Sequence, residues 1–309
     1  DAEHGVGWRL ETAMEFPKML TNGAIRKDSL IYALGATIAR HCQELGVHVN
    51  FAPVVDINSN PRNPIIGMRS FGEDPEEVTQ KAILYAYGSL SQNVLPVIKH
   101  FPGHGDTDTD SHHTLPVIPH SRELYPYQHL IEAGIPAVMV SHLAVKSIDS
   151  TGIPASLSSP VIQELLRRDL NFSGLCFTDA MNMKGVTQNS QPGEAEVKAL
   201  LAGNDMLLFP ANLGKAVEAI KKALADSLLD ERTIDEKCRK ILEAKQKYVL
   251  PNVYPAETPG LWSRLNSPTD IALKQQLYQA AITLIKNTDS LLPLKRLDTL
   301  RIASLNFGA

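Results

Sequence analysis

Residues 94–113 read Val94-Leu-Pro-Val-Ile-Lys99-His100-Phe-Pro-Gly-His-Gly-Asp-Thr-Asp-Thr-Asp110-Ser-His112-His113. The apolar run that opens this stretch has the length and composition of a buried strand. The residues after it include two glycines, three aspartates and, with His100, four histidines. So many titratable groups beside a strand end cost solvation free energy unless they are used. The stretch therefore predicts a functional site at the carboxyl end of a strand.

Runs of the same kind occur on both sides of this stretch. Short apolar runs predict strands over residues 47–55, 137–142, 174–179 and 205–209, and helical patterns predict helices over 75–90, 160–169, 213–229 and 233–248. This alternation is typical of a parallel α/β fold. None of these strands is followed by the glycine-rich loop of a dinucleotide-binding sheet, and several lead into a polar residue, among them Asp56, His142 and Asp179. Polar residues at the carboxyl ends of several strands favour a TIM (β/α)8 barrel.

The predicted strands are too few to close a barrel. With the run at 94–100 they number five, whereas a barrel has eight. We expect the first three strands to precede Asp1, because Asp1-Ala-Glu-His-Gly also reads as the middle of a longer protein. The expected organisation is an N-terminally incomplete catalytic barrel over residues 1–250, a proline-rich linker and a helix over 251–281, and the beginning of a second α/β sandwich domain over 282–309.

The composition is that of an ordinary globular protein with a sizeable core. Of 309 residues, 43% are hydrophobic and 21% are charged, and the formal net charge is −4. This charge does not suggest a nucleic-acid partner or contact with an anionic membrane, and no apolar run is long enough to span a membrane. The three cysteines, Cys42, Cys176 and Cys238, are far apart and lack metal-binding spacing, so we expect buried free thiols.

Three groups of residues are candidates for chemistry. Asp110 and His112 stand at positions i and i+2 of the loop, where the carboxylate can orient the imidazole and support its protonated form. Asp179 ends a buried strand, where it is either a reactive carboxylate or the N-cap of the next helix. Arg69, within Arg69-Ser-Phe-Gly-Glu-Asp-Pro, is either a ligand-binding or an ordinary surface arginine. The alternating aspartates and histidines of the loop also suit a divalent ion, although no zinc or EF-hand spacing is present.

Three motifs occur in one order along the chain: Arg69-Ser-Phe-Gly-Glu-Asp-Pro, Lys99-His-Phe-Pro-Gly-His-Gly with Asp110-Ser-His112, and Thr178-Asp-Ala-Met-Asn-Met. Together they resemble glycoside hydrolase family 3, and within it the β-N-acetylglucosaminidase branch. The resemblance implies that Asp179 is the nucleophile and that Asp110 and His112 form the acid/base dyad. It also implies sugar binding by five residues: Asp1, Arg9, Arg69, Lys99 and His100.

The activity that this resemblance implies is that of a retaining exo-β-N-acetylglucosaminidase, which works by double displacement without a metal or another cofactor. The expected substrates are peptidoglycan fragments or chitin-type oligosaccharides with N-acetylglucosamine at the non-reducing end. Three other interpretations stay open: a family 3 β-glucosidase, a metal-dependent TIM-barrel amidohydrolase and a non-catalytic sugar-binding barrel. By analogy with the family, we expect a bacterial protein with a further C-terminal domain, and a periplasmic or secreted location is favoured over a cytoplasmic one.

Overall fold

The computed structural model describes residues 1–109, 115–118, 123–188, 191, 193–250, 256–288, 290–301 and 303. All the strand pairs within these ranges are parallel. The largest sheet has the order β3-β5-β7-β8, made of β3 (Ile98–Phe101), β5 (Ala137–Val140), β7 (Leu175–Ala180) and β8 (Met206–Leu208). Two smaller pairs are β1 (Val49–Asn50) with β2 (Leu95–Pro96), and β4 (Val117–Ile118) with β6 (Ala144–Val145). A bridge from Val54 to Lys99 links the segment after β1 to β3.

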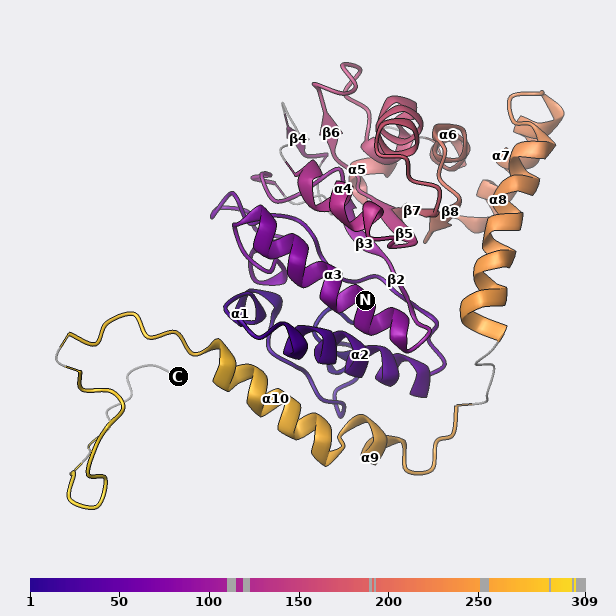
Figure 1. Ribbon diagram of the computed structural model, residues 1–309. Coiled ribbons are helices and arrows are strands. Elements are labelled where there is room, and N and C mark those ends of the chain that lie inside the picture. Colours follow the sequence, from indigo (N-terminus) through magenta and orange to yellow (C-terminus); the bar gives the residue numbers. More distant parts are fainter. Residues whose placement is uncertain are drawn as a thin grey trace.

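The strands lie at the five predicted places and are neighbours in their order along the chain. Helices alternate with these strands along the chain (Figure 1). They are α2 (Asp28–Glu44), α3 (Pro75–Ser91), α4 (Leu124–Glu132), a π-helix (Pro160–Asp169), α6 (Glu194–Ala202), α7 (Leu213–Ala225) and α8 (Glu231–Ala244), which continues as a π-helix (Lys245–Val249). This succession confirms the predicted TIM-barrel-like α/β fold. The expectation of three strands before Asp1 stays a prediction.

Shorter elements join these helices and strands. They are the 3-10 turns Val6–Trp8, Gly67–Arg69 and Ala155–Leu157, and the helices α1 (Met19–Gly23), α5 (Lys184–Thr187), α9 (Leu261–Leu265) and α10 (Pro268–Ala281). Two of them, Val6–Trp8 and Gly67–Arg69, border the pocket at the carboxyl ends of the strands.

The ends of the long helices follow from local side chains. Asp74 caps α3 by accepting hydrogen bonds of 2.9 Å from two backbone amides of the first turn. The helix α8 begins two residues before the predicted Thr233, because the side chain of Asp230 supplies the cap. The helix α7 ends at Ala225, short of the predicted residue 229, and Ser227 then turns the chain with a φ of 58°.

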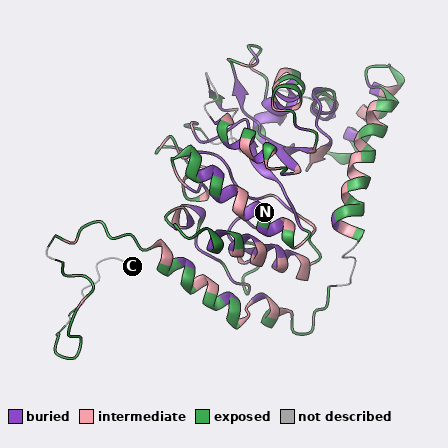
Figure 2. Cartoon of the chain, in the orientation of Figure 1, coloured by how far each residue is buried: buried purple, intermediate pink, exposed green. Residues whose placement is uncertain are grey.

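The main core lies between the helices α2, α3 and α4 and the sheet, where buried residues are concentrated (Figure 2). The helices α2 and α3 approach so closely that a Cβ atom at Gly35 would lie 2.1 Å from the carbonyl oxygen of Tyr85. A Cβ atom at Gly88 would lie 2.3 Å from the carbonyl oxygen of Tyr32. Each large apolar side chain buried in this core contributes about 1.5–3 kcal/mol. The packing therefore holds a rigid platform for the strand ends.

The helices α9 and α10 pack against α2, and α10 does so through a partly buried ionic contact. Arg40 donates to both carboxylate oxygens of Asp270 at 2.7 Å, and Nε2 of His41 lies 3.1 Å from the same carboxylate. Beyond α10 the chain runs away from the body of the molecule (Figure 1), and Ile285 is 94% exposed. The described residues after 281 form no helix or strand, so the second domain over 282–309 stays a prediction.

The sequence analysis found no run long enough to span a membrane and predicted that the three cysteines are buried free thiols. Within the described ranges, no helix has both the length and the apolar character needed to cross a bilayer. Cys42 and Cys176 are buried free thiols, as expected. Cys238 is exposed, which corrects the prediction, because α8 buries none of its residues fully.

Candidate active site

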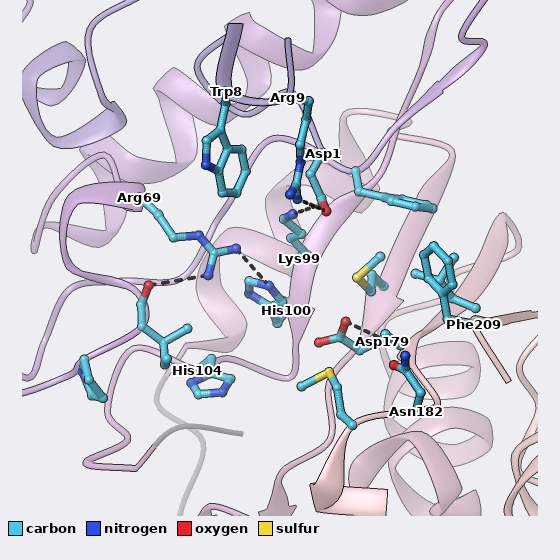
Figure 3. A pocket seen from close by; sticks show the side chains of 17 residues that line it. Asp1, Trp8, Arg9, Arg69, Lys99, His100, His104, Asp179, Asn182 and Phe209 are labelled. Atoms are coloured by element: carbon cyan, nitrogen blue, oxygen red, sulfur yellow. Dashed lines mark hydrogen bonds and ion pairs between the residues drawn. The ribbon is translucent and has the colours of Figure 1, made fainter. Parts of the chain in front are cut away.

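The carboxyl ends of the strands open into a pocket of about 790 Å³ (Figure 3). Six of the eight predicted site residues line it: Asp1, Arg9, Arg69, Lys99, His100 and Asp179. They come from the N-terminal segment, the turn Gly67–Arg69, the strand β3 and the end of β7. The other two, Asp110 and His112, lie outside the described residues. The volume is within the range of sites for small molecules.

One wall of the pocket is a continuous set of ion pairs, called here the ion-pair wall. The Nζ atom of Lys99 lies 2.8 Å from Oδ1 of Asp1 and 2.8 Å from Oε1 of Glu3. Arg69 pairs with the same Glu3 through Nε and Nη2, at 3.0 and 2.7 Å. At the other end of the wall, Nη2 of Arg9 lies 3.0 Å from Oδ2 of Asp1. Paired charges of this kind are held in fixed positions, from which they can donate to and accept from the hydroxyl groups of a ligand.

Glu3 is the centre of the ion-pair wall, although the sequence analysis did not single it out. Its side chain is 1% exposed. Burial raises the pKa of the Glu3 carboxyl, but Lys99 and Arg69 lower it more, so the pKa lies well below its usual range. Glu3 is therefore ionised and holds both cations at the pocket. Arg69 is engaged in this wall with only 24% of its side chain exposed, so it is not an ordinary surface arginine.

The imidazole of His100 is held from two sides. Its Nδ1 atom contacts the buried carboxylate of Asp56, and its Nε2 atom lies 3.3 Å from Nη2 of Arg69. The Oδ1 atom of Asp56 also accepts hydrogen bonds from the backbone amides of His100 and His104, at 3.1 and 2.9 Å. Asp56 therefore fixes both the end of β3 and the start of the turn that follows.

Asp179 lies across the pocket from Arg69 (Figure 3). Its Oδ1 atom accepts a hydrogen bond of 2.8 Å from the amide of Ala180. Burial raises the pKa of Asp179, but neighbouring groups, of which His100 has the largest effect, lower it below its usual value. Asp179 does not cap α5, whose N-cap residue is Met183. The structure thus presents an anionic carboxylate at the pocket, which is the state that a nucleophile requires.

His142, the polar residue after β5, supports the strand that carries Asp179. Its Nε2 atom donates to the carbonyl oxygen of Ala180 at 3.0 Å, and its Nδ1 atom lies 2.7 Å from Oγ of Ser156. The histidine is fully buried. The side chain of His142 therefore helps to hold β7 in place, and it does not line the pocket.

Three aromatic residues that line the pocket, Trp8, Phe51 and Phe209, were not predicted as site residues from the sequence. Trp8 is 39% exposed, and the guanidinium carbon of Arg9 lies 4.3 Å from its ring centroid. Phe209 follows β8, is 65% exposed and has a φ of 45°, a backbone conformation that costs free energy for a residue with a side chain. Aromatic rings with a few charged groups are the usual lining of a ligand site. The only sequence signal was the place of Trp8 directly before Arg9.

A metal site was the alternative interpretation of the loop that contains Asp110 and His112. Among the residues that the structure describes, no three histidine, cysteine, aspartate or glutamate side chains are grouped so that they could hold a metal ion. The loop itself lies outside those residues, so this alternative is decided by experiment.

The fold and the pocket define a TIM-barrel-like α/β protein with a polar, carboxylate-bearing pocket at the carboxyl ends of its strands. Residues 1–244 match the family model of the glycosyl hydrolase family 3 N terminal domain. The chain belongs to this family, as its motifs predicted.

Several characterised proteins resemble the chain over most of its length. Beta-hexosaminidase A from Pseudoalteromonas piscicida is 34% identical over 314 residues, which cover 92% of this chain and 52% of that protein. The structure of a glycoside hydrolase family 3 beta-N-acetylglucosaminidase from Paenibacillus sp. str. FPU-7 superimposes with a TM-score of 0.87 at 34% identity, covering 93% of this chain and 56% of that one. The beta-glucoside phosphorylase BglX gives a TM-score of 0.86 at 30% identity, with coverages of 95% and 57%. The chain spans about half the length of the curated relatives it matches.

Proposed function

We propose that this chain is the catalytic part of a β-N-acetylglucosaminidase that removes N-acetylglucosamine from the non-reducing end of β-linked saccharides. The position of Asp179 carries the proposal, because a buried carboxylate with a lowered pKa faces the same pocket as the ion-pair wall. The likeness to a beta-hexosaminidase and to a beta-N-acetylglucosaminidase over more than nine tenths of the chain supports this substrate class.

The proposed reaction is a double displacement. The carboxylate of Asp179 attacks the anomeric carbon while the bond to the leaving oxygen breaks, and His112 donates a proton to that oxygen. Asp110 orients the imidazole of His112 and stabilises its protonated form. His112 then removes a proton from a water molecule, which displaces Asp179 from the sugar. Two inversions at the same carbon leave the product with the β configuration of the substrate.

The ion-pair wall provides the groups that a sugar needs. Asp1, Arg9 and Lys99 meet at one end of the wall, and we assign them to the hydroxyls that are distant from the scissile bond. Arg69 and His100 contact each other, and both interact favourably with the ionised carboxylate of Asp179. We therefore assign them to the hydroxyls next to the anomeric carbon.

Hydrolysis of 4-nitrophenyl N-acetyl-β-glucosaminide, compared with hydrolysis of the β-glucoside, tests the proposal in the wild-type protein and in a His112→Ala variant. We expect a strong preference for the acetamido sugar. The variant should lose about 10²–10⁴-fold in turnover and recover part of it with added azide, which needs no general base.

Other outcomes would favour the other interpretations. Equal or better cleavage of the glucoside would replace the proposal with a β-glucosidase. Activity that resists chelation of divalent ions would exclude a metal-dependent amidohydrolase. Sugar binding without turnover of any aryl glycoside would indicate a non-catalytic barrel, and a His112→Ala variant as active as the wild type would remove His112 from the mechanism.

A phosphorylase is the second candidate function, and the likeness to the beta-glucoside phosphorylase BglX favours it. Hydrolysis and phosphorolysis share the covalent glycosyl-enzyme and differ in the acceptor, because an oxygen of inorganic phosphate replaces water in the second step. The two functions are separated by ³¹P NMR of the reaction with and without phosphate. N-acetylglucosamine 1-phosphate as the main product would establish the phosphorylase.

We also propose peptidoglycan fragments as the natural substrates and a periplasmic or secreted location in a bacterium. The proposal follows the analogy with longer members of the family. A higher kcat/KM on a muropeptide fragment than on chitobiose would support the substrate, and cell fractionation with an antibody to the protein would test the location.

A further inference from the structure

Glu123 is a buried acidic residue that does not serve the helix it precedes. It is 2% exposed and occupies the N-cap position of α4, but its side chain makes no capping hydrogen bond. An acidic N-cap residue ordinarily accepts from the amides of its own first turn. The carboxyl oxygens of Glu123 instead accept from the backbone amides of Ile57 at 2.9 Å and of Asp106 at 3.0 Å, and a further backbone hydrogen bond comes from Gly105. Its hydrogen bonds therefore join the segment that follows β1 to the turn that follows β3.

The two glycines of the turn allow it to lie against Glu123. Gly103 has a φ of 122°, and a Cβ atom there would lie 2.4 Å from the Cβ atom of Glu123. A Cβ atom at Gly105 would lie 1.7 Å from the carbonyl oxygen of Ile57. Non-bonded atoms do not approach this closely, so a side chain at either position would push the turn away from its neighbours, Glu123 and Ile57.

The opposite side of the same turn is held by Asn63. Its Nδ2 atom donates to the carbonyl oxygens of His104 and Gly105, at 2.7 and 3.0 Å, and to Oγ1 of Thr107 at 3.2 Å. Asp56 accepts from the amide of His104, as described above. The amides of the turn thus donate to two carboxyl groups, and its carbonyl oxygens accept from one carboxamide, so the turn 103–107 has little freedom to move.

Glu123 is absent from the lining of the pocket, whereas His104 belongs to it. Any effect of Glu123 on the reaction is therefore transmitted through the turn. The chain that leaves the turn reaches Asp110 after Asp108 and Thr109. We propose that Glu123 is a positioning residue, which together with Asn63 fixes the turn 103–107, the part of the chain that leads in sequence to Asp110 and His112. This inference rests on the proposed function of that loop as the acid/base.

A misplaced acid/base has a signature that a general loss of stability lacks. Protonation matters for a poor leaving group such as phenol and hardly at all for 2,4-dinitrophenol, which leaves as an anion. For Glu123→Gln in the full protein, kcat/KM on the phenyl N-acetyl-β-glucosaminide should fall on the order of 10–100-fold, a part of the usual general-acid effect. On the dinitrophenyl glycoside, kcat/KM should fall less than about 3-fold. This constant reports only the formation of the covalent glycosyl-enzyme, in which the dinitrophenolate leaves without a proton.

The matched control is Asp149→Asn, which alters another buried carboxylate. Asp149 accepts from Thr151 and from Ser158 Oγ, and among the residues that the structure describes it forms no hydrogen bond or ion pair with the turn. Its effect on kcat/KM should be the same for both leaving groups. An equal fall for both substrates in Glu123→Gln, or no fall in either, would overturn the inference. If Glu123→Gln does not fold, Gly103→Ala displaces the same turn and should give the same dependence on the leaving group.

Failure of the proposed function would be visible separately, because the wild type would then cleave neither glycoside. Amide hydrogen exchange decides the inference in that case. Glu123→Gln should accelerate exchange at Gly105 and Asp106 while leaving exchange in the sheet, including β7, unchanged. Unchanged protection at these two amides would refute the role of Glu123 in fixing the turn.

Discussion

The Nδ1 atom of His100 lies 2.6 Å from Oδ2 of Asp56, a distance typical of a strong, charge-assisted hydrogen bond. The two residues belong to neighbouring strand positions, since Asp56 follows β1 and His100 lies in β3. Asp56 is fully buried, whereas His100 lines the pocket. A residue without access to the ligand therefore decides how a ligand-facing imidazole is oriented.

Replacing Asp56 by asparagine should lower the free energy of unfolding by about 1–3 kcal/mol, because buried donors lose their carboxylate partner. Burial raises the pKa of Asp56, but its neighbours, first among them His100, bring it below the ordinary 3.8. The carboxylate thus stabilises the fold above that value, and this contribution is lost as the pH falls. Denaturant unfolding at a series of pH values should show a smaller acid-induced loss in Asp56→Asn than in the wild type. The exposed Asp108→Asn is the control, and parallel acid losses in Asp56→Asn and wild type would contradict the prediction.

Replacing Glu3 by glutamine should weaken substrate binding, since Lys99 and Arg69 lose the charge that holds them at the pocket. We expect kcat/KM to fall on the order of 100-fold, mostly through KM, which corresponds to about 2.8 kcal/mol. The free energy of unfolding should also fall by about 3–5 kcal/mol, because buried cations lose their partner. Steady-state kinetics and denaturant unfolding measure the two effects. Glu11→Gln, at an exposed position of the same segment, should change neither, and a wild-type KM in Glu3→Gln would rule out this role.

Replacing Asp179 by asparagine should abolish the covalent step and reduce turnover by about 10⁴-fold or more. With a 2-fluoro sugar, the wild type should gain the mass of one glycosyl group on the peptide that contains Asp179, and the variant should not. ¹H NMR of the wild-type reaction should show the β-anomer as the first product. An α-anomer formed first would mean inversion and would exclude the nucleophilic role. Asp205→Asn, a buried carboxylate at the start of β8 that binds Arg167, should lower stability without this loss of turnover.

The pH dependence of stability at Glu123 should have the opposite sign to that at Asp56. Burial, followed by the charge of Asp56, raises the pKa of Glu123 from 4.5 to about 8. A raised pKa in the folded state means that the contribution to stability is complete below about 4.5 and is lost as the pH rises through about 8. The stability advantage of the wild type over Glu123→Gln should therefore shrink between these pH values in urea unfolding. An advantage that grows with pH would mean that the backbone amides keep the carboxyl ionised.

The strands and most of the site could be predicted because each signal is local in the sequence. An apolar run that ends in Lys99 and His100, or in Asp179, carries its own length and its own terminal polar group. The four helices predicted within residues 75–248 were found at their places, although α7 ends earlier than predicted and α8 begins earlier, because Asp230 competes with Thr233 as the cap. The helices α2, α4 and α6 were not predicted.

The partners of these side chains could not be predicted, because they depend on contacts between distant segments. Glu3 is an ordinary acidic residue in the sequence, and its place at the centre of the ion-pair wall arises from Arg69 and Lys99, which are 66 and 96 positions away. Glu123 looks like a helix cap by its position, and only the fold shows that its carboxylate faces Asp106. Sequence spacing reports neither burial nor the direction of a side chain.

Lys99 and His100 lie on β3 and Asp179 lies on β7, two strands of one sheet that are separated by β5. Asp110 and His112 follow β3 in the sequence and belong to neither strand. Substitutions at Asp110 and His112 should therefore leave the register of the sheet unchanged, so the residues assigned to the sugar and those assigned to proton transfer can be varied separately. Such a division would let the acceptor be changed at positions beyond the turn 103–107 while the strand ends keep their hold on the donor sugar. Directed evolution toward new acceptors should accordingly randomise the loop and leave the strand ends unchanged.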